Sequence, residues 1–242
     1  ALGLSMGGKK AMVEMQFADF VSCGFNQIVN NLAKTYYRWG QNSDVVIRMP
    51  TGGGSAAGPF HSQSNEAWFF HVAGLRIVYP ITPSDAKGLL LAAFEDPNPV
   101  LFFEHKGLYR SIKEEVHTAE YTIEIGKANV LMQGDDITFI TYGLGVQWCT
   151  EVIDYQSISA TLVDLRTLLP WDKDTVREAV KSTGKVIVVH EDTQEGGIGG
   201  EVAAWIGEHC FTSLDAPVMR VGSLDTPIPF NADLEINFMG KS

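Results

Sequence analysis

Several short runs of this chain are apolar at nearly every position, and this limits the folds open to it. The runs Val-Val-Ile-Arg-Met at 45–49 and Val-Leu-Phe-Phe at 100–103 do not alternate between apolar and polar residues. Strands of this kind are buried on both faces, as in parallel sheets covered by helices. Segments with helical periodicity lie between the runs, for example over 24–39. The alternation predicts an α/β fold with mostly parallel sheets.

The alternation falls into two blocks. We expect a first domain over 1–105, a polar linker without periodicity over 106–121, and a second α/β domain over 122–242. The predicted strands cover 12–17, 45–49, 76–79, 100–104, 137–142, 160–165, 185–190 and 218–221. The predicted helices cover 24–39, 65–71, 84–95, 146–155, 170–180 and 202–210.

The composition argues against several classes of function. The 29 acidic and 18 basic residues give a net charge of −11, and no basic run is present. We therefore expect neither a nucleic acid nor a membrane as a partner, and no apolar run approaches the roughly 18 residues of a membrane span. Cys23, Cys149 and Cys210 are widely spaced, which predicts reduced thiols. The first ten residues have the wrong charge order for a signal peptide.

A glycine-rich loop between a predicted strand and a predicted helix is the first candidate site. Residues 51–64 contain four glycines and His61, which is followed by Ser62, a residue suited to a helix N-cap. Open α/β sheets bind ligands where loops leave the carboxyl ends of strands. An imidazole there can give or take a proton near neutral pH. His61 is therefore either a catalytic group or a loop histidine bonded to the backbone.

Two glycine clusters raise the question of phosphate binding. The loop over 51–58 lacks the Gly-Lys-Ser/Thr ending of a P-loop. The turn over 196–200 would need a glycine at 202 to complete a dinucleotide fingerprint, and Val202 stands there. A tight turn against a helix start is the favoured interpretation of this segment, and a nicotinamide-linked oxidoreductase is the weaker alternative.

Other candidates each have a structural alternative. Phe20 follows the first predicted strand, so its ring belongs either to the core or to a surface that stacks on a flat cofactor. His71 lies beside two phenylalanines and is expected in the core. His190 ends a predicted strand just before Glu191 and Asp192, where it either lines a cleft or is structural.

Seven segments occur in an order and spacing that resemble one family. The chain is similar over nearly its whole length to the beta subunit, or the beta half of a fused chain, of thiamine-diphosphate-dependent 2-oxo acid dehydrogenases. The branched-chain members are the more similar, and the pyruvate-specific members are close behind. The segments are EMQFADF (14–20), FNQIVN (25–30), HSQSNEA (61–67), DAKGLL (85–90), DPNPV (96–100), LYR (108–110) and LRTLLP (165–170).

The resemblance implies a fold and a set of site residues. It implies a partial pyrimidine-binding domain with a mostly parallel sheet, followed by a transketolase C-terminal-like domain. Phe20 would pack on the aminopyrimidine ring, and His61 would handle protons and acyl transfer to lipoyl. A potassium ion would be held largely by backbone oxygens. Its ligands would be Ser43, Val45, Val46, Ala93, Asp96 and Asn98, with a structural loop as the alternative.

The resemblance also implies an assembly. An alpha subunit or alpha half would bind most of the thiamine diphosphate and its Mg²⁺. Two beta parts would pair within an α2β2 heterotetramer, and a lipoyl acyltransferase core would accept the acyl group. The expected location is the bacterial cytoplasm or the mitochondrial matrix. A non-catalytic docking module for that core is the rival hypothesis.

One family feature has no counterpart here. The glutamate that activates thiamine precedes the helix before the first strand, and Glu14 and Asp19 match other family positions. By the same resemblance, we expect the chain to stop short of the family's final helix. We therefore expect the 242-residue chain to be inactive by itself.

Overall fold

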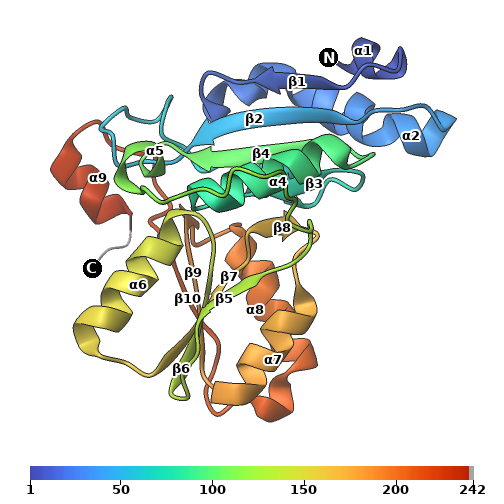
Figure 1. The fold of residues 1–242 in the computed structure, drawn as a ribbon. Helices are drawn as coiled ribbons and strands as arrows, with labels where there is room; N and C mark the ends of the chain where they lie inside the picture. Colours follow the sequence, from blue (N-terminus) through green and yellow to red (C-terminus); the bar gives the residue numbers. More distant parts are fainter. Residues whose placement is uncertain (240–242) are drawn as a thin grey trace.

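The computed structural model describes residues 1–239, in which two five-stranded sheets lie against each other with their strands running crosswise (Figure 1). The first sheet contains β1 (Ala11–Glu14), β2 (Val45–Thr51), β3 (Arg76–Val78), β4 (Val100–His105) and β8 (Thr167–Leu169). Its order is β1-β2-β4-β3-β8. All pairs are parallel except β3 with β8. The second half of the chain thus supplies an edge strand to the sheet of the first half.

The second sheet is also mostly parallel. It contains β5 (Asn129–Met132), β6 (Ile137–Thr141), β7 (Ala160–Asp164), β9 (Val186–Thr193) and β10 (Met219–Ser223). The order is β10-β9-β6-β7-β5, and β5 runs antiparallel to β7. The prediction of an α/β chain with mostly parallel sheets is confirmed.

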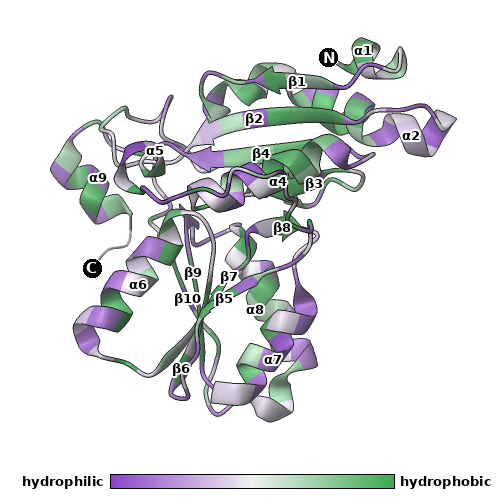
Figure 2. Ribbon diagram, in the orientation of Figure 1, coloured by the Kyte–Doolittle hydropathy of each residue, from purple (hydrophilic) through white to green (hydrophobic). Residues whose placement is uncertain are grey.

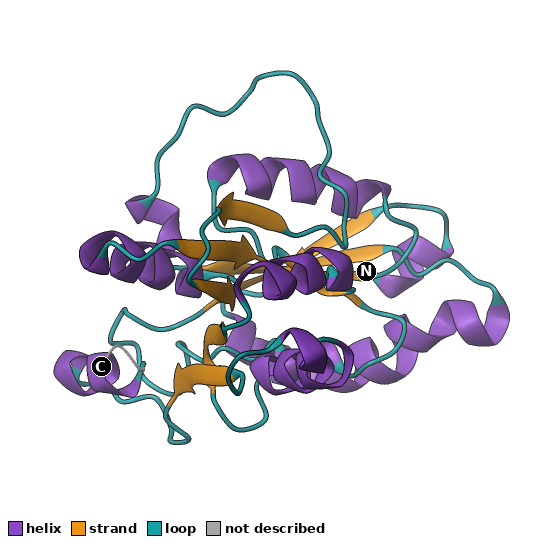
Figure 3. Ribbon diagram, turned by 90° about the horizontal axis from the view of Figure 1, so that it is seen from below, coloured by secondary structure: helices purple, strands orange, loops and turns teal. Residues whose placement is uncertain are grey.

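Helices cover both sheets. The helical elements of the first half are α1 (Leu2–Met6), the 3-10 segment η1 (Ala18–Gly24), the π-helical segment η2 (Gln27–Leu32), α2 (Ala33–Trp39), α3 (Ala67–Phe70), α4 (Pro83–Glu95) and α5 (Leu108–Ser111). Those of the second half are α6 (Leu144–Gln156), α7 (Lys173–Thr183), α8 (Ile198–His209), η3 (Phe211–Ser213) and α9 (Ala232–Phe238). Figure 3 shows helices on both sides of the strands. On the second sheet, α6 packs on one face and α7 and α8 pack on the other (Figure 1).

The core is continuous between the two sheets. Ile47 and Phe103 of the first sheet belong to the same buried cluster as Ile140 and Val163 of the second. A separate cluster under α4 includes Phe102. Strands β2 and β4 are accordingly apolar along most of their length (Figure 2), as expected for strands buried on both faces.

The predicted helix over 24–39 is wrong in detail. The chain forms η1, η2 and α2 in succession instead of one α-helix. The side-chain amide of Asn30 donates to the side chain of Asn26, and the side-chain amide of Asn31 donates to the side chain of Gln27. Polar side chains that bond to one another along this face accompany the wider π-helical turn. Apolar periodicity does not register such a change of pitch.

The predicted helix cap at Ser62 is also wrong. Helix α3 begins at Ala67, five residues after Ser62, so Ser62 does not cap it. Helix α4 is capped by Thr82, whose hydroxyl accepts from the Asp85 amide, and Pro83 occupies its first turn. Asp172 caps α7, because its side chain accepts from the Thr175 amide. None of the helices within residues 1–239 has the length and apolarity that crossing a membrane requires.

Candidate active site

Three aromatic rings meet beside the carboxyl end of β1. Phe17 and Phe20 follow β1, and their ring centroids are 5.6 Å apart. The imidazole of His61 lies 4.9 Å from the Phe17 ring and 5.6 Å from the Phe20 ring, edge-on to both. His61 is half-buried, and Phe20 keeps 39% of its surface exposed. The two sequence-predicted site residues therefore share one surface at the edge of the first sheet.

The loop that carries His61 is fixed on the first domain by its neighbour Gln63. One oxygen of the buried Asp19 carboxylate accepts from both the backbone and the side-chain amide of Gln63, at 3.1 and 2.9 Å. The Gln63 carbonyl accepts from the Thr51 hydroxyl at 2.9 Å. These contacts join the two ends of the glycine loop and place His61 next to η1.

Carboxylates of the second half occupy the amides of the glycine loop. The Gly53 amide donates to Glu191 at 2.5 Å, while the Gly54 and Ala56 amides donate to Glu235 at 2.9 and 2.8 Å. A phosphate-binding loop would need such amides free. The structure therefore agrees with the prediction that this loop is not a P-loop.

Gly52 lies against a buried contact between His105 and Glu191. His105 ends β4, and its Nε2 atom is 2.6 Å from a carboxylate oxygen of Glu191. Gly52 has φ +91°, and a Cβ atom on it would stand 2.1 Å from the His105 ring. The backbone conformation and the close approach both require glycine at this position.

We therefore expect Gly52→Ala to disrupt the loop. The methyl group must displace His105, whose ring is 1% exposed and held by Glu191, so the thermal unfolding midpoint should fall by several degrees. Gly54→Ala is the matched control, because its φ of +83° is equally unfavourable but no atom lies within 4 Å of its Cβ position. Differential scanning fluorimetry of both variants compares the steric and the conformational effect. Equal midpoints would show that the contact with His105 is unimportant.

Buried acids gather where the two sheets meet. Burial, with the nearby Asp192, raises the pKa of Glu66 well above its usual value, although the Tyr142 hydroxyl donates to it at 2.9 Å. Burial raises the pKa of Asp192 to about 7. Burial acts in the same direction on Glu191, but His105, the Gly53 amide and Lys106 outweigh it and lower the pKa. Glu191 is therefore the anion that binds the loop.

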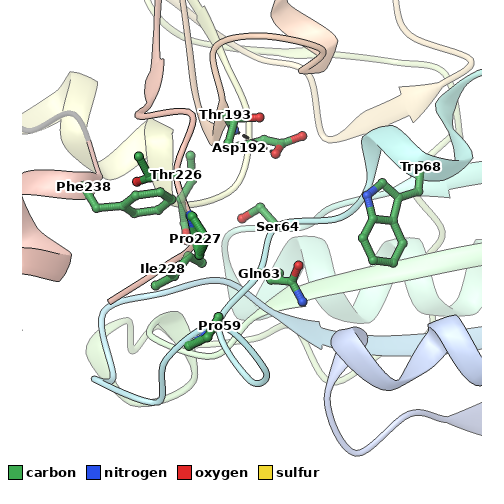
Figure 4. Close-up of a pocket in the computed structure, with 11 residues that line it drawn as sticks. Pro59, Gln63, Ser64, Trp68, Asp192, Thr193, Thr226, Pro227, Ile228 and Phe238 are labelled. Carbon is green, nitrogen blue, oxygen red and sulfur yellow. Dashed lines mark hydrogen bonds between the residues drawn. The ribbon is translucent and has the colours of Figure 1, made fainter. Parts of the chain in front are cut away.

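A cavity of about 300 Å³ opens beside these acids (Figure 4). The first half contributes the segment around His61 and the second half contributes the end of β9 and the segment before α9. The lining residues are Pro59, Gln63, Ser64, Trp68, Glu191, Asp192, Thr193, Thr226, Pro227, Ile228 and Phe238. The cavity lies behind the His61 loop, at the junction of the two halves.

The six residues of the predicted potassium site surround the amino ends of β2 and β4. Val45 and Val46 begin β2 and Ser43 lies just before it, while Ala93 lies in the last turn of α4 and Asp96 and Asn98 lie between α4 and β4. The Ser43 carbonyl accepts from the Val45 amide at 2.9 Å. The Asp96 carbonyl accepts from the Lys10 ammonium at 2.7 Å, and its carboxylate pairs with Arg76.

These contacts test whether the residues fit a potassium ion. A potassium ion needs oxygen ligands, and the Asp96 carbonyl is such a ligand. This carbonyl already accepts from the Lys10 ammonium, so a metal ion bound there would share it with Lys10. Within residues 1–239, no three or more His, Cys, Asp or Glu side chains are grouped to hold a metal ion.

The structure also places the other two candidates from the sequence, His190 and His71. His190 is fully buried, and Cβ atoms on Gly197 or Gly199 would stand 2.6 or 2.5 Å from its ring. The glycines at the start of α8 therefore make room for this ring. His71 is exposed, so its expected place in the core was wrong.

Sequence reasoning missed His105, Glu191 and Glu235 as groups around the loop. His105 and Glu191 each follow an apolar run at the carboxyl end of a strand, the position that pointed to His61. That signal was therefore present for these two residues. Glu235 lies on a short helix far along the chain, and no local pattern distinguishes it.

Comparisons with known proteins agree with this architecture. A family model described as the transketolase pyrimidine binding domain matches residues 1–112, and one described as the transketolase C-terminal domain matches residues 126–240. A solved structure titled "Split gene transketolase, inactive beta4 tetramer" superposes with a TM-score of 0.77 at 26% identity, covering 100% of this chain and 75% of that one.

Proteins similar to this chain along nearly its whole length identify the family more closely. The 2-oxoisovalerate dehydrogenase subunit beta of Bacillus subtilis is 50% identical over 98% of this chain and 75% of its own length. The mitochondrial subunit beta 2 of Arabidopsis thaliana is 45% identical over 94% of this chain, which spans 65% of that protein. The pyruvate dehydrogenase E1 component subunit beta of Bacillus subtilis is 43% identical over 96% of this chain and 73% of its own length. The chain therefore belongs to the family of 2-oxo acid dehydrogenase E1 beta subunits.

Proposed function

We propose that this chain is the beta part of an enzyme that decarboxylates a branched-chain 2-oxo acid of the 2-oxoisovalerate type and transfers the acyl group to a lipoyl arm. The observation that carries the proposal is the contact of His61 with the Phe17 and Phe20 rings at the carboxyl edge of the first sheet. Ligands of open α/β sheets bind at this edge. The family membership supports the same reaction.

Identity supports the choice of substrate. The chain is 50% identical to the Bacillus subtilis beta subunit named for 2-oxoisovalerate and 43% identical to the one named for pyruvate. We therefore favour a branched-chain substrate, with pyruvate as the alternative.

Phe20 fits a flat cofactor ring. The exposed part of its side chain offers an apolar face, and stacking adds about 0.5–1.5 kcal/mol to the burial of surface, so Phe20 orients a ring and does not activate it. Thiamine diphosphate, when bound, supplies the nucleophilic carbon and the electron sink for loss of CO₂. We assign its diphosphate and Mg²⁺ to the alpha part.

His61 is placed to move a proton next to that ring. Within residues 1–239, the imidazole contacts the Phe17 and Phe20 rings, and no hydrogen bond fixes its tautomer. Either nitrogen can therefore hold a proton for the lipoyl sulfur or release one to it. The Asp19–Gln63 contact limits how far the imidazole moves during this step.

Partners and location follow from the same proposal. Large apolar side chains on α2, namely Tyr36, Tyr37 and Trp39, are 63–94% exposed, which supports coverage by another chain. We propose an α2β2 assembly with an alpha part and a lipoyl acyltransferase core. The location would be the bacterial cytoplasm or the mitochondrial matrix. A potassium ion at the Asp96 carbonyl would stabilise the amino ends of β2 and β4.

Reconstitution tests the proposal. We expect the complex of this chain with an alpha-type partner, thiamine diphosphate, Mg²⁺ and an oxidised lipoyl domain as acceptor to release CO₂ from 2-oxoisovalerate. Its kcat/KM should exceed that for pyruvate by about 10-fold or more, the discrimination that one or two methyl groups provide. The chain without its partner serves as the control and should show no turnover. A complex that binds the cofactor and acts on neither acid would refute the proposal.

A further inference from the structure

Helix α9 holds the glycine loop through one buried carboxylate. Asn231 caps this helix by accepting from the Asp233 and Leu234 amides, and the Glu235 side chain then points into the loop. Its two oxygens accept from the Gly54 and Ala56 amides at 2.9 and 2.8 Å. Glu235 is 2% exposed, whereas its helix neighbours Leu234 and Ile236 are at least half exposed. The carboxylate is therefore committed to the loop.

The loop needs such a partner because its backbone is unusual. Gly54, Ala56 and Gly58 all have positive φ, at 83°, 51° and 72°. Alanine rarely adopts this conformation, and it persists only where the surroundings impose it. Both hydrogen bonds go to the two oxygens of one side chain, so a single carboxylate holds both amides. They fix the loop in this otherwise unfavourable course.

A second contact of the same segment leads to His61. The Phe230 ring lies against Gly58, where a Cβ atom would stand 2.3 Å from it. The Gly58 carbonyl in turn accepts from the His61 amide at 3.3 Å. His61 thus lies between an anchor in the first domain, the Asp19–Gln63 contact, and an anchor in the second half of the chain.

We propose that Glu235 is a positioning residue for His61. It acts through the loop and touches neither substrate nor cofactor. The inference rests on the proposed function, because it assigns to Glu235 the placement of the group that handles the proton in acyl transfer. It also makes the orientation of the second domain part of the geometry of the site.

Glu235→Gln in the assembled α2β2 enzyme tests this role. The amide keeps one acceptor oxygen but turns an NH₂ group toward the second loop amide. We expect acylation of a free lipoyl domain to slow about 10-fold in kcat, while the Kd of thiamine diphosphate changes less than about 3-fold. Glu235→Asp, which retains the carboxylate, should recover part of the rate. Asp233→Asn is the matched control, since this exposed acid lies on the same helix and its variant should behave as wild type.

Hydrogen exchange separates positioning from general stabilisation and needs no cofactor. In the wild-type complex the Gly54 and Ala56 amides should exchange at least about 10-fold more slowly than the Ser55 amide. Glu235→Gln should remove this protection within 52–60 and leave β6 and β9 unchanged. Exchange of Gly54 as fast as that of Ser55 in the wild type would overturn the proposal.

Two further outcomes would also overturn it. One is a uniform rise of exchange in both sheets of Glu235→Gln, because that would mean a merely structural residue. The other is an unchanged acylation rate in Glu235→Gln together with a slowed rate in His61→Ala. If His61→Ala acylates lipoyl at the wild-type rate, the role assigned to His61 fails and the role of Glu235 fails with it. A wild-type complex that acylates no lipoyl would contradict the proposed function instead.

Discussion

Replacing His61 with alanine in the complete complex is expected to slow acylation of lipoyl by about 100-fold or more, the usual effect of removing a general acid–base group. Phe20 and the Asp19–Gln63 contact stay in place, because His61 touches Phe17 and Phe20 only edge-on. The surface offered to the cofactor is therefore retained, and its Kd should change only a few-fold. Single-turnover transfer to a free lipoyl domain measures the rate, and calorimetry measures the Kd.

His71→Ala is the matched control for this experiment. His71 ends α3, ten residues further along the chain, and its side chain is exposed. Its variant should acylate lipoyl at the wild-type rate. Wild-type acylation by His61→Ala would remove the role assigned to the imidazole, whereas equal losses of rate and cofactor affinity would make it a binding residue.

The sequence predicted the sheets well because burial on both faces leaves a local signal. The run over 45–49 and the run over 100–104 became β2 and β4, adjacent strands in the centre of the first sheet. Strand β8 left no such signal. Its three residues pair antiparallel with β3, in the other half of the chain, so its partner rather than its own pattern makes it a strand.

The candidate site also contains some residues that the local sequence pattern indicates and others that it does not. His61 and Phe20 could be found because both follow strands whose carboxyl ends lie at one edge. The contacts of Glu191 and Glu235 with the loop join residues 138 to 181 positions apart. Such contacts depend on how the two halves pack, which periodicity and turn chemistry do not encode. The glycines at 52 and 58 are typical of positions with a close neighbour, but the sequence does not indicate that these neighbours are His105 and Phe230.

Asp164→Asn is expected to stabilise the fold strongly at alkaline pH. Asp164 ends β7 and is fully buried; one oxygen accepts from the Arg166 amide at 3.0 Å, and the other has no partner within the described chain. Burial raises the pKa of this carboxyl from 3.8 to about 8. An asparagine keeps the acceptor for the Arg166 amide and has the same shape, but it never ionises.

The raised pKa of Asp164 sets the direction in which stability changes with pH. Below about 3.8 the carboxyl is neutral in both the folded and the unfolded chain, so it causes no pH dependence there. Between about 3.8 and 8 the unfolded chain loses the proton first, so the wild type loses about 1.4 kcal/mol of stability per pH unit. Above about 8 the loss is complete. The advantage of the asparagine variant should therefore grow by on the order of 4 kcal/mol between pH 5 and pH 8.5.

Thermal unfolding at the two pH values measures this difference. For a chain of this size, 4 kcal/mol corresponds to a shift of the midpoint on the order of 10 °C. Asp136→Asn, at an exposed position before β6, is the matched control and should follow the wild type at both pH values. The Asp164→Asn variant should keep part of the wild-type pH dependence of stability, because Glu66 and Asp192 also have raised pKa values. If the Asp164→Asn advantage is the same at pH 5 and pH 8.5, the carboxyl is not held neutral by burial, and the end of β7 tolerates its charge.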